Sequence, residues 1–407
     1  MEAAKVNKPM PLIIHDLQDS QIFSLAQEAG RAGIRVEGTC HPFEPWLKAS
    51  QYIDKAVKLT CLAYITSSAY ALNLRNSGLS GVWLPCSDDL VEFTARYRPL
   101  LEHMGMRFLS PNEEQYEMTQ QYHLLPEVKG LEKSFGGDIQ VSALYENIDE
   151  LPYPLIIKAK RWEYRTIDNA VDFLAFLDSH QGKEHQEDSL SLQAWIEGGI
   201  ERMASAILLF DANGHVVRGF TGRRQRVVPT PYGTFGESTA VKAEWIPELY
   251  DGAVALLSAM KWQGFAEVEC KQAPDGKWYV MEVNPRISGW ACLAEIDGAG
   301  MLQAYYDMCA HGAVLEEACL QRSDSRYVRM ITTCYHDPDW AVSTEENDTI
   351  WKRIKRIVYT LREYRKDSTR FSLGAWDGQD LGASLYLLRR SIRRVWAIYR
   401  GKSELFD

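Results

Sequence analysis

Two apolar runs that carry charged residues at alternate positions constrain the fold of this chain more than any other feature. The first run covers residues 265–271, the second covers residues 278–283, and Pro274-Asp275-Gly276 lies between them. Alternation around a turn of this kind is typical of an antiparallel β-hairpin. Because side chains alternate between the two faces of a strand, Glu267 and Glu269 are expected to share one face.

The second run continues through Glu282, Asn284 and Arg286, which also alternate and therefore share a face. If the two runs pair, Glu269 lies on the same face as Glu282 and Asn284. Two carboxylates and an amide oxygen form the kind of site that Mg²⁺ prefers, with phosphate and water completing its coordination. Arg286 would neutralise charge on a transferring phosphoryl group. Taken as isolated residues, the same set would instead be a solvent-facing acidic hairpin.

The segment Glu282-Val283-Asn284-Pro285-Arg286 resembles the E-x-N-P-R signature of the ATP-grasp superfamily, and Val268-Glu269 resembles its first metal-binding acid. The resemblance covers roughly residues 10 to 310 and is to carboxylate–amine ligases and the ATP-grasp domain of the carbamoyl-phosphate synthase large subunit. It implies an α/β chain whose first three parts are a Rossmann-like pre-ATP-grasp domain (1–109), a small α+β lobe (110–190) and a large lobe with the metal site (191–320). The resemblance does not account for a fourth part, a basic, mainly helical extension (321–407).

The resemblance also implies roles for individual residues. Lys158, which ends an apolar run, is similar to the lysine that holds the α- and β-phosphates. The segment containing Gln193, Trp195 and Ile196 is similar to the adenine-binding hinge, and Glu201 stands where the family places a ribose-binding acid. The implied metal ligands are Glu269, Glu282 and Asn284, and the implied cofactors are ATP and Mg²⁺, with Mn²⁺ as an alternative.

Three arginines in residues 222–226 would bind a substrate carboxylate or an acyl phosphate. The resemblance favours Arg226 as the catalytic partner of Arg286, and a solvated basic loop is the alternative. The nearby Ser288-Gly289-Trp290 is expected to shape the acceptor pocket or to be an ordinary turn.

The chain departs from the family pattern in two places. Residues 159–165 contain no glycine where the family has a glycine-rich phosphate lid, so Lys160, Arg161 or Arg165 would have to replace it. Gln120-Gln121 stands where the family has an early cation, and Lys129 is the replacement that we assign to cofactor binding, with Lys133 as an alternative. Both departures concern nucleotide affinity more than the fold.

The first hundred residues alternate between apolar runs and helical patterns, which favours a parallel α/β sheet. Residues 15–20 follow the first run, and they contain no G-x-G-x-x-G motif. A dinucleotide cofactor is therefore not expected. The eight cysteines form no C-x-x-C pair, and no apolar run is long enough to span a bilayer. These features predict a cytoplasmic protein.

The charge is unevenly distributed along the chain. Residues 350–402 contain 14 Lys and Arg against four Asp and Glu, in a chain whose net charge is −10. The acidic body argues against nucleic-acid binding. Leu385, Leu388, Ile392, Val395, Trp396 and Tyr399 recur at helical spacing, with arginines on the other side. This helix would either pack on the acidic body or bind an anionic partner, such as the inner membrane surface or an acidic carrier.

Together these features predict an ADP-forming ligase that activates a small-molecule carboxylate for attack by a small-molecule amine. A non-catalytic nucleotide-binding regulator or scaffold on the same fold is the alternative. A homodimer is a further open alternative. The sequence does not name the acid or the amine, because acceptor specificity resides in loops grafted on the fold.

Overall fold

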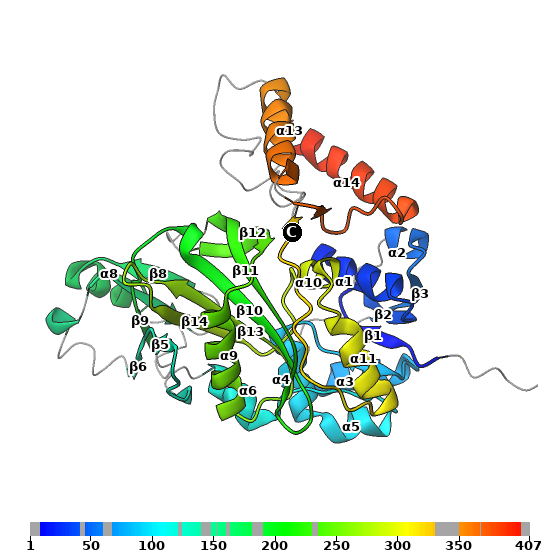
Figure 1. Cartoon of the computed structure of the whole chain (residues 1–407), viewed down its shortest axis with the longest axis horizontal. Coiled ribbons are helices and arrows are strands. Elements are labelled where there is room, and N and C mark those ends of the chain that lie inside the picture. The colour runs from blue at the N-terminus through cyan, green and yellow to red at the C-terminus, as the bar shows by residue number, and fades with distance from the viewer. Residues whose placement is uncertain are drawn as a thin grey trace, which may run out of the picture.

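Three β-sheets organise the chain (Figure 1). The structure is a computed structural model, and it describes residues 9–40, 45–59, 67–120, 124–139, 148–151, 153–159, 163–180, 190–229, 235–329, 350–366 and 368–399. Strands β1–β4 form the N-terminal sheet, strands β6–β9 form a small sheet, and the remaining strands form an eight-stranded sheet. The mixed α/β architecture agrees with the class expected from the sequence.

The N-terminal sheet is parallel throughout, as predicted, and its strand order is β3-β2-β1-β4. Its strands are β1 (Leu12–Ile14), β2 (Val36–Cys40), β3 (Ile53–Lys58) and β4 (Val82–Leu84). Its helices are α1 (Ser20–Arg31), α2 (Pro45–Ala49), α3 (Ser68–Asn76), α4 (Asp88–Arg96) and α5 (Arg98–His103), and α6 (Glu113–Gln120) follows them. Because β2 and β4 flank β1 on opposite sides, the strand order reverses direction between β1 and β4.

The eight-stranded sheet has the order β16-β15-β12-β11-β10-β13-β14-β5. The predicted hairpin is confirmed, because β13 pairs antiparallel with β14, and β10 and β11 form a second antiparallel hairpin. The strands are β5 (Leu131–Lys133), β10 (Met203–Phe210), β11 (Val216–Pro229), β12 (Phe235–Ala243), β13 (Gly264–Gln272), β14 (Trp278–Asn284), β15 (Ser325–Val328) and β16 (Arg370–Ser372). Helix α9 (Pro247–Ala259) packs its buried side chains on this sheet.

The small sheet is antiparallel, with the order β6-β9-β7-β8, and it lies at the far end of the molecule from the N-terminal sheet (Figure 1). Its strands are β6 (Phe135–Ile139), β7 (Leu155–Ala159), β8 (Glu163–Ile167) and β9 (Leu190–Ala194). Phe173 and Phe176 of α8 (Ala170–His180) are fully buried against Ile157 and Ile167. The small lobe therefore has a hydrophobic core of its own.

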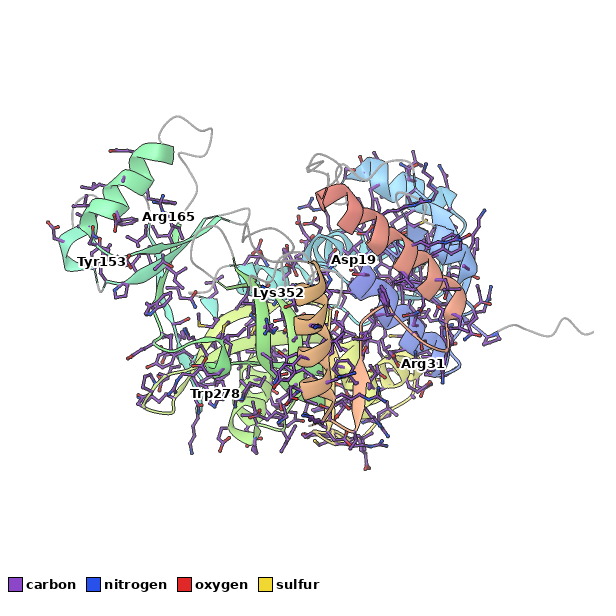
Figure 2. All side chains as sticks on the ribbon, turned by 90° about the horizontal axis from the view of Figure 1, so that it is seen from above. Asp19, Arg31, Tyr153, Arg165, Trp278 and Lys352 are labelled. Atoms are coloured by element: carbon purple, nitrogen blue, oxygen red, sulfur yellow. The ribbon has the colours of Figure 1, made fainter. Side chains whose placement is uncertain are left out.

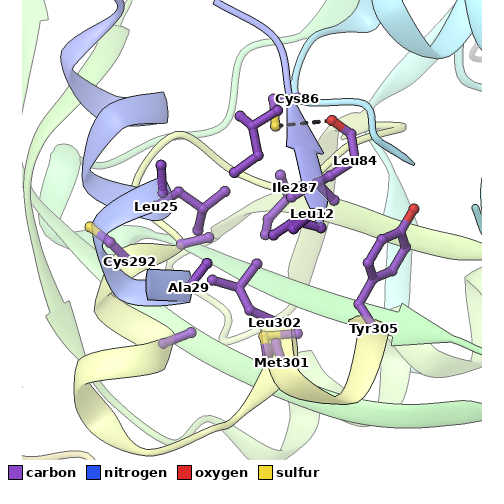
Figure 3. Close-up of a cluster of buried hydrophobic side chains, with 14 of the residues drawn as sticks. Leu12, Leu25, Ala29, Leu84, Cys86, Ile287, Cys292, Met301, Leu302 and Tyr305 are labelled. Carbon is purple, nitrogen blue, oxygen red and sulfur yellow. Dashed lines mark hydrogen bonds between the residues drawn. The ribbon is translucent and has the colours of Figure 1, made fainter. Parts of the chain in front are cut away.

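The N-terminal sheet and the segment after β14 share one hydrophobic core (Figure 3). Leu12 and Leu25 pack with Ile287, and with Leu302 and Tyr305 of α11 (Met301–His311), while α10 (Cys292–Asp297) lies alongside. The Tyr305 hydroxyl also donates a 2.6 Å hydrogen bond to the carbonyl of Trp83. This shared core fixes the N-terminal sheet relative to the β13–β14 hairpin.

The C-terminal part contains two strands in addition to the helices that the sequence predicts there. Strands β15 and β16 come from this part, and they complete one edge of the eight-stranded sheet. Figure 2 shows α13 (Ile350–Lys366), which carries Lys352, and α14 (Leu381–Tyr399) on one side of the molecule. Strand β16 is hard to recognise in the sequence, because it has only three residues, of which one is apolar, and none of them is buried.

Helix α14 packs on α2, but not through the face that the sequence predicts. Ala383 and Leu387 are buried, whereas Leu385 is 60% exposed and Leu388 is 37% exposed. The reason is Gly382: a Cβ atom there would lie 2.3 Å from the carbonyl oxygen of Ala49, so only glycine permits this approach. The side chains of Ile392, Val395, Trp396 and Tyr399 lie outside the described set. No helix in the described ranges is long and apolar enough to cross a membrane.

Candidate functional site

A cavity of about 660 Å³ lies between the N-terminal sheet and the β13–β14 hairpin. The hairpin wall contributes Glu267, Glu269, Glu282, Asn284 and Arg286. The predicted metal ligands and one predicted catalytic arginine are therefore brought to one cavity.

The strand register explains why these side chains converge. Glu269 pairs directly with Glu282, and Glu267 pairs directly with Asn284, so all four share one face of the sheet. This pairing confirms the register expected from the sequence. Cys270 then pairs with Val280, so β14 has one extra residue beyond this point, which is a β-bulge.

Arg224 of β11 is the main partner of the acidic pair. Its guanidinium forms an ion pair with Glu269, and the Asn284 amide donates a 3.0 Å hydrogen bond to the other oxygen of that carboxylate. Burial opposes the charge of Arg224, but Glu269 and Glu267 outweigh it, and the pKa of Arg224 is raised. The Glu269 carboxylate is therefore in surroundings that stabilise a positively charged partner, here the guanidinium of Arg224.

Arg286 connects the two walls of the cavity. Its Nε lies 3.2 Å from Asp88 of α4, and its Nη1 lies 3.8 Å from Glu267. Trp290 donates a 3.0 Å hydrogen bond from Nε1 to the other oxygen of Glu267. Burial, together with the charge of Glu269, raises the pKa of Glu267 to about 7, although Arg286 and Arg224 act in the opposite direction.

The structure does not bring Arg226 to this cavity, contrary to the role expected from the sequence. Arg224 pairs with Val241, and Arg226 pairs with the next residue on β12, Ala240. Neighbouring residues on β12 face opposite sides, so the bulge at Gln225 turns Arg226 away from the side that Arg224 faces. Arg226 instead donates a 3.0 Å hydrogen bond to the hydroxyl of Tyr364 in α13.

The predicted adenine hinge follows β9. Gln193 is buried and donates a 2.6 Å hydrogen bond to Ser134, while Ile196 is buried nearby in the chain. Trp195 faces the ammonium of Lys271, which lies 5.0 Å from the ring centroid. Glu201 accepts a 3.0 Å hydrogen bond from the backbone of Gly199.

Lys271 is a buried cation that the sequence reasoning missed. It follows Glu269 at the alternate position of β13, so both face the same side, and burial lowers its pKa. The alternation that identified Glu267 and Glu269 extends to this residue, and it would have revealed the lysine.

Other predicted nucleotide contacts are not placed by the structure. Lys158 is in β7 and pairs through its backbone with Ser191, but its side chain lies outside the described set. Lys129 is exposed just before β5, and it does not line the cavity. Gln121, Lys160 and Arg161 also lie outside the described residues. Arg165 lies 5.9 Å from the ring of Phe176, on the α8 side of its sheet (Figure 2).

The opposite wall of the cavity was not expected from the sequence. It contains His15, Asp16 and Asp19, which follow β1, and Asp88 and Asp89, which follow β4. Side chains just beyond the carboxyl ends of parallel strands commonly face a ligand. Both groups are visible in the sequence, but only the strand order shows that they meet.

The hairpin wall fits a magnesium ion that is shared with a nucleotide. Among the described residues, no group of three or more His, Cys, Asp or Glu side chains forms a metal site. Two carboxylates and one amide oxygen are too few for a cage made only by protein. They suit Mg²⁺, which usually takes the rest of its ligands from phosphate and water.

No family model and no curated protein sequence matches this chain. Several solved structures, however, are similar to it. The biotin carboxylase domain of 2-oxoglutarate carboxylase from Hydrogenobacter thermophilus, a dimer crystallised with MgADP, ADP and bicarbonate, is 15% identical, with a TM-score of 0.58 over 79% of this chain and 74% of that one.

Two further structures are similar to a comparable extent. L-amino acid ligase from Bacillus licheniformis is 16% identical, with a TM-score of 0.54 over 75% of each chain. N5-carboxyaminoimidazole synthetase from Staphylococcus aureus is 12% identical, with a TM-score of 0.54 over 77% of this chain and 80% of that one. These likenesses show that the chain shares the fold of these structures, which is the ATP-grasp fold.

Proposed function

We propose that this protein is an ATP- and Mg²⁺-dependent ligase that joins a carboxylate to an amine and forms ADP. The observation that carries the proposal is the direct pairing of Glu269 with Glu282 on the wall of a cavity that also contains Asn284 and Arg286. The ATP-grasp neighbours support ligase chemistry of this general kind.

In the proposed reaction, the substrate carboxylate takes the γ-phosphoryl group of ATP, and ADP leaves. The amine then attacks the acyl phosphate, a C–N bond forms, the C–O bond to phosphate breaks, and the amine loses a proton. Magnesium bound by Glu269, Glu282 and Asn284 would neutralise phosphate charge. Arg224 and Arg286 would bind the carboxylate and orient it, because guanidinium groups match the geometry of carboxylates and phosphates.

The nucleotide would lie between the two lobes of the grasp. Trp195 and Ile196 would contact the adenine, Glu201 the ribose, and Lys158 the phosphates, as the family resemblance implies. Lys271 would add a positive charge on the same side of β13 as Glu269.

An ADP-release assay with pooled carboxylates and pooled amines tests this function. ADP production should require ATP, Mg²⁺, one carboxylate and one amine together, and the product should contain a new amide bond by mass spectrometry. ADP release that is independent of any carboxylate would contradict the proposal.

A non-catalytic nucleotide-binding protein is the second candidate, and the absence of glycine from residues 159–165 favours it. Calorimetric titration with a non-hydrolysable ATP analogue separates the two. Tight nucleotide binding without ADP release from any substrate pool would support the second candidate.

We further propose that the protein acts in the cytoplasm and that α14 contacts an anionic membrane surface there. Leu385 and Leu388 are exposed beside Arg389 and Arg393, which are exposed as well. Basic residues near an anionic bilayer each contribute about 1 kcal/mol. Sedimentation with anionic liposomes should therefore be strong at low salt, weak at high salt, and lost when Leu385 and Leu388 are changed to Ser. Equal sedimentation of this variant would contradict the proposed contact.

A further inference from the structure

The carboxyl ends of β1 and β4 form a crevice at the point where the N-terminal sheet reverses its strand order. In open parallel sheets, ligands bind in the crevice at such a reversal. Here that crevice opens into the same cavity as the Glu269–Glu282 pair. The topology therefore points to a second ligand position opposite the proposed metal site.

The chemistry of this crevice is acidic. Asp16 follows β1, and Asp88 and Asp89 follow β4. Asp88 is neutralised by Arg286, whereas Asp89 is exposed at the mouth of the cavity, and no ion pair or hydrogen bond of its carboxylate is found among the described residues. Partial desolvation and the charges of Asp88 and Asp16 raise the pKa of Asp89, so a cation is the ligand that this carboxylate would favour.

The dipole of helix α4 gives a structural reason for only two of these three carboxylates. Asp88 and Asp89 are in the first turn of α4, where the helix dipole favours negative charge. Asp16 is not in a helix, and its φ of 56° is in the left-handed region that few residues other than glycine adopt. The helix dipole therefore does not account for this third carboxylate, which accepts a 2.9 Å hydrogen bond from Gln18 and lies 3.0 Å from Nε2 of His15.

An independent observation comes from Ser238 of β12. Its side chain lines the cavity and is 5% exposed, yet its hydroxyl has no hydrogen-bond partner among the described residues. Strand β12 is connected to the N-terminal wall next to Ser238. The backbone N–H of Arg329 donates a 2.7 Å hydrogen bond to the carbonyl of Thr239, and the guanidinium of Arg329 lies 3.6 Å from Asp19. A buried hydroxyl left without a partner costs free energy unless a ligand completes its hydrogen bonding.

We propose that the cavity binds its amine substrate against Asp16, Asp89 and Ser238, and that this amine carries a second positive charge, as a diamine or a basic amino acid does. The inference rests on the proposed ligase function for the identity of the ligand as an amine. The attacking nitrogen must be neutral, so it does not balance the carboxylates of the crevice. A second nitrogen that stays protonated balances the charge of the carboxylates, and the Ser238 hydroxyl accepts a hydrogen bond from one of its N–H groups.

Direct binding tests the proposal without any need for turnover. We would titrate the full chain with putrescine, which has two ammonium groups, and with butylamine, which has one, at about 0.15 M salt to screen non-specific contacts. Putrescine should bind at one site per chain at least about tenfold more tightly than butylamine. Asp89→Asn and Ser238→Ala should each weaken putrescine binding about tenfold or more.

Glu92→Gln is the matched control, because Glu92 is on the same helix as Asp89 but does not line the cavity. Asp16→Asn is a second variant that keeps the backbone, because asparagine tolerates the left-handed conformation. Equal affinity for the two amines, or putrescine binding that survives Asp89→Asn and Asp16→Asn in folded protein, would overturn the inference.

The outcome is separable from that of the ligase proposal. If putrescine binds as expected but no ADP forms with any carboxylate, the crevice is a diamine site and the ligase function fails. If ADP forms only with uncharged or acidic amines, the ligase function stands and this inference fails.

Discussion

The two walls of the cavity handle charge in opposite ways. On the hairpin wall, Arg224 neutralises Glu269, and Arg286 lies near Glu267. The N-terminal wall adds the carboxylates of Asp16, Asp19, Asp88 and Asp89, and among the described residues that line the cavity it contributes no lysine or arginine. The first wall is suited to anionic groups that react with the help of cations, and the second is suited to a cationic ligand. This difference is the basis of our proposal that one cavity receives two substrates of unlike charge.

The largest effect is expected from a substitution in the hairpin wall. Glu282→Gln is nearly isosteric and removes one metal-binding charge, so ADP release should fall at least about 100-fold while thermal unfolding changes little. Glu248→Gln, an exposed position on α9, is the control and should leave the rate unchanged. Wild-type ADP production by folded Glu282→Gln protein would remove the basis for the metal site.

Two matched arginine substitutions in β11 test which of the two side chains acts in the cavity. Arg224→Met should lower ADP release about 100-fold, because it removes one of the two arginines that line the cavity in the described ranges. Arg226→Met should change the rate by less than about threefold, because the bulge turns this arginine toward Tyr364. Equal losses in the two variants would mean that the strand register at Gln225 differs from the one described.

The smallest effect concerns Glu267, whose pKa is raised from 4.5 to about 7. A carboxyl whose pKa is higher in the folded protein contributes stability below pH 4.5, and this contribution is lost as the pH rises through about 7. The loss would be up to about 3 kcal/mol for this group. Urea unfolding at pH 5 and pH 7.5 should therefore show a smaller pH dependence for Glu267→Gln than for the wild type. Parallel pH profiles would show that Glu267 titrates normally.

The sequence predicts the hairpin wall well because the wall is local. Glu269 and Glu282 are separated by one turn, so alternation and a turn signal are enough to pair them. The N-terminal wall needs the strand order, since Asp16 and Asp88 are far apart in the chain and meet only because β4 lies beside β1. Periodicity carries no information about which strands become neighbours.

Two further features could not be read from the sequence, for different physical reasons. The bulge at Gln225 reverses the face of Arg226, and a single extra residue leaves no trace in a pattern of apolar residues. Helix α14 packs through Ala383 because Gly382 lets the backbone come close to α2, so close approach outweighs the larger apolar residues Leu385 and Leu388. Hydrophobic spacing alone would select the opposite face.

The attachment of α14 also has a consequence for the order of events during synthesis. Asp380 is buried, and it accepts hydrogen bonds from Gln27 and Ser50, which precede it by 353 and 330 residues. The edge of the eight-stranded sheet is likewise complete only after β16 has been synthesised and has paired with β15. Because synthesis proceeds at about 5–20 residues per second, the residues of the N-terminal sheet leave the ribosome many seconds before these partners do. A nascent chain stalled before residue 370 would therefore lack the contacts that cover α2 and complete this sheet edge.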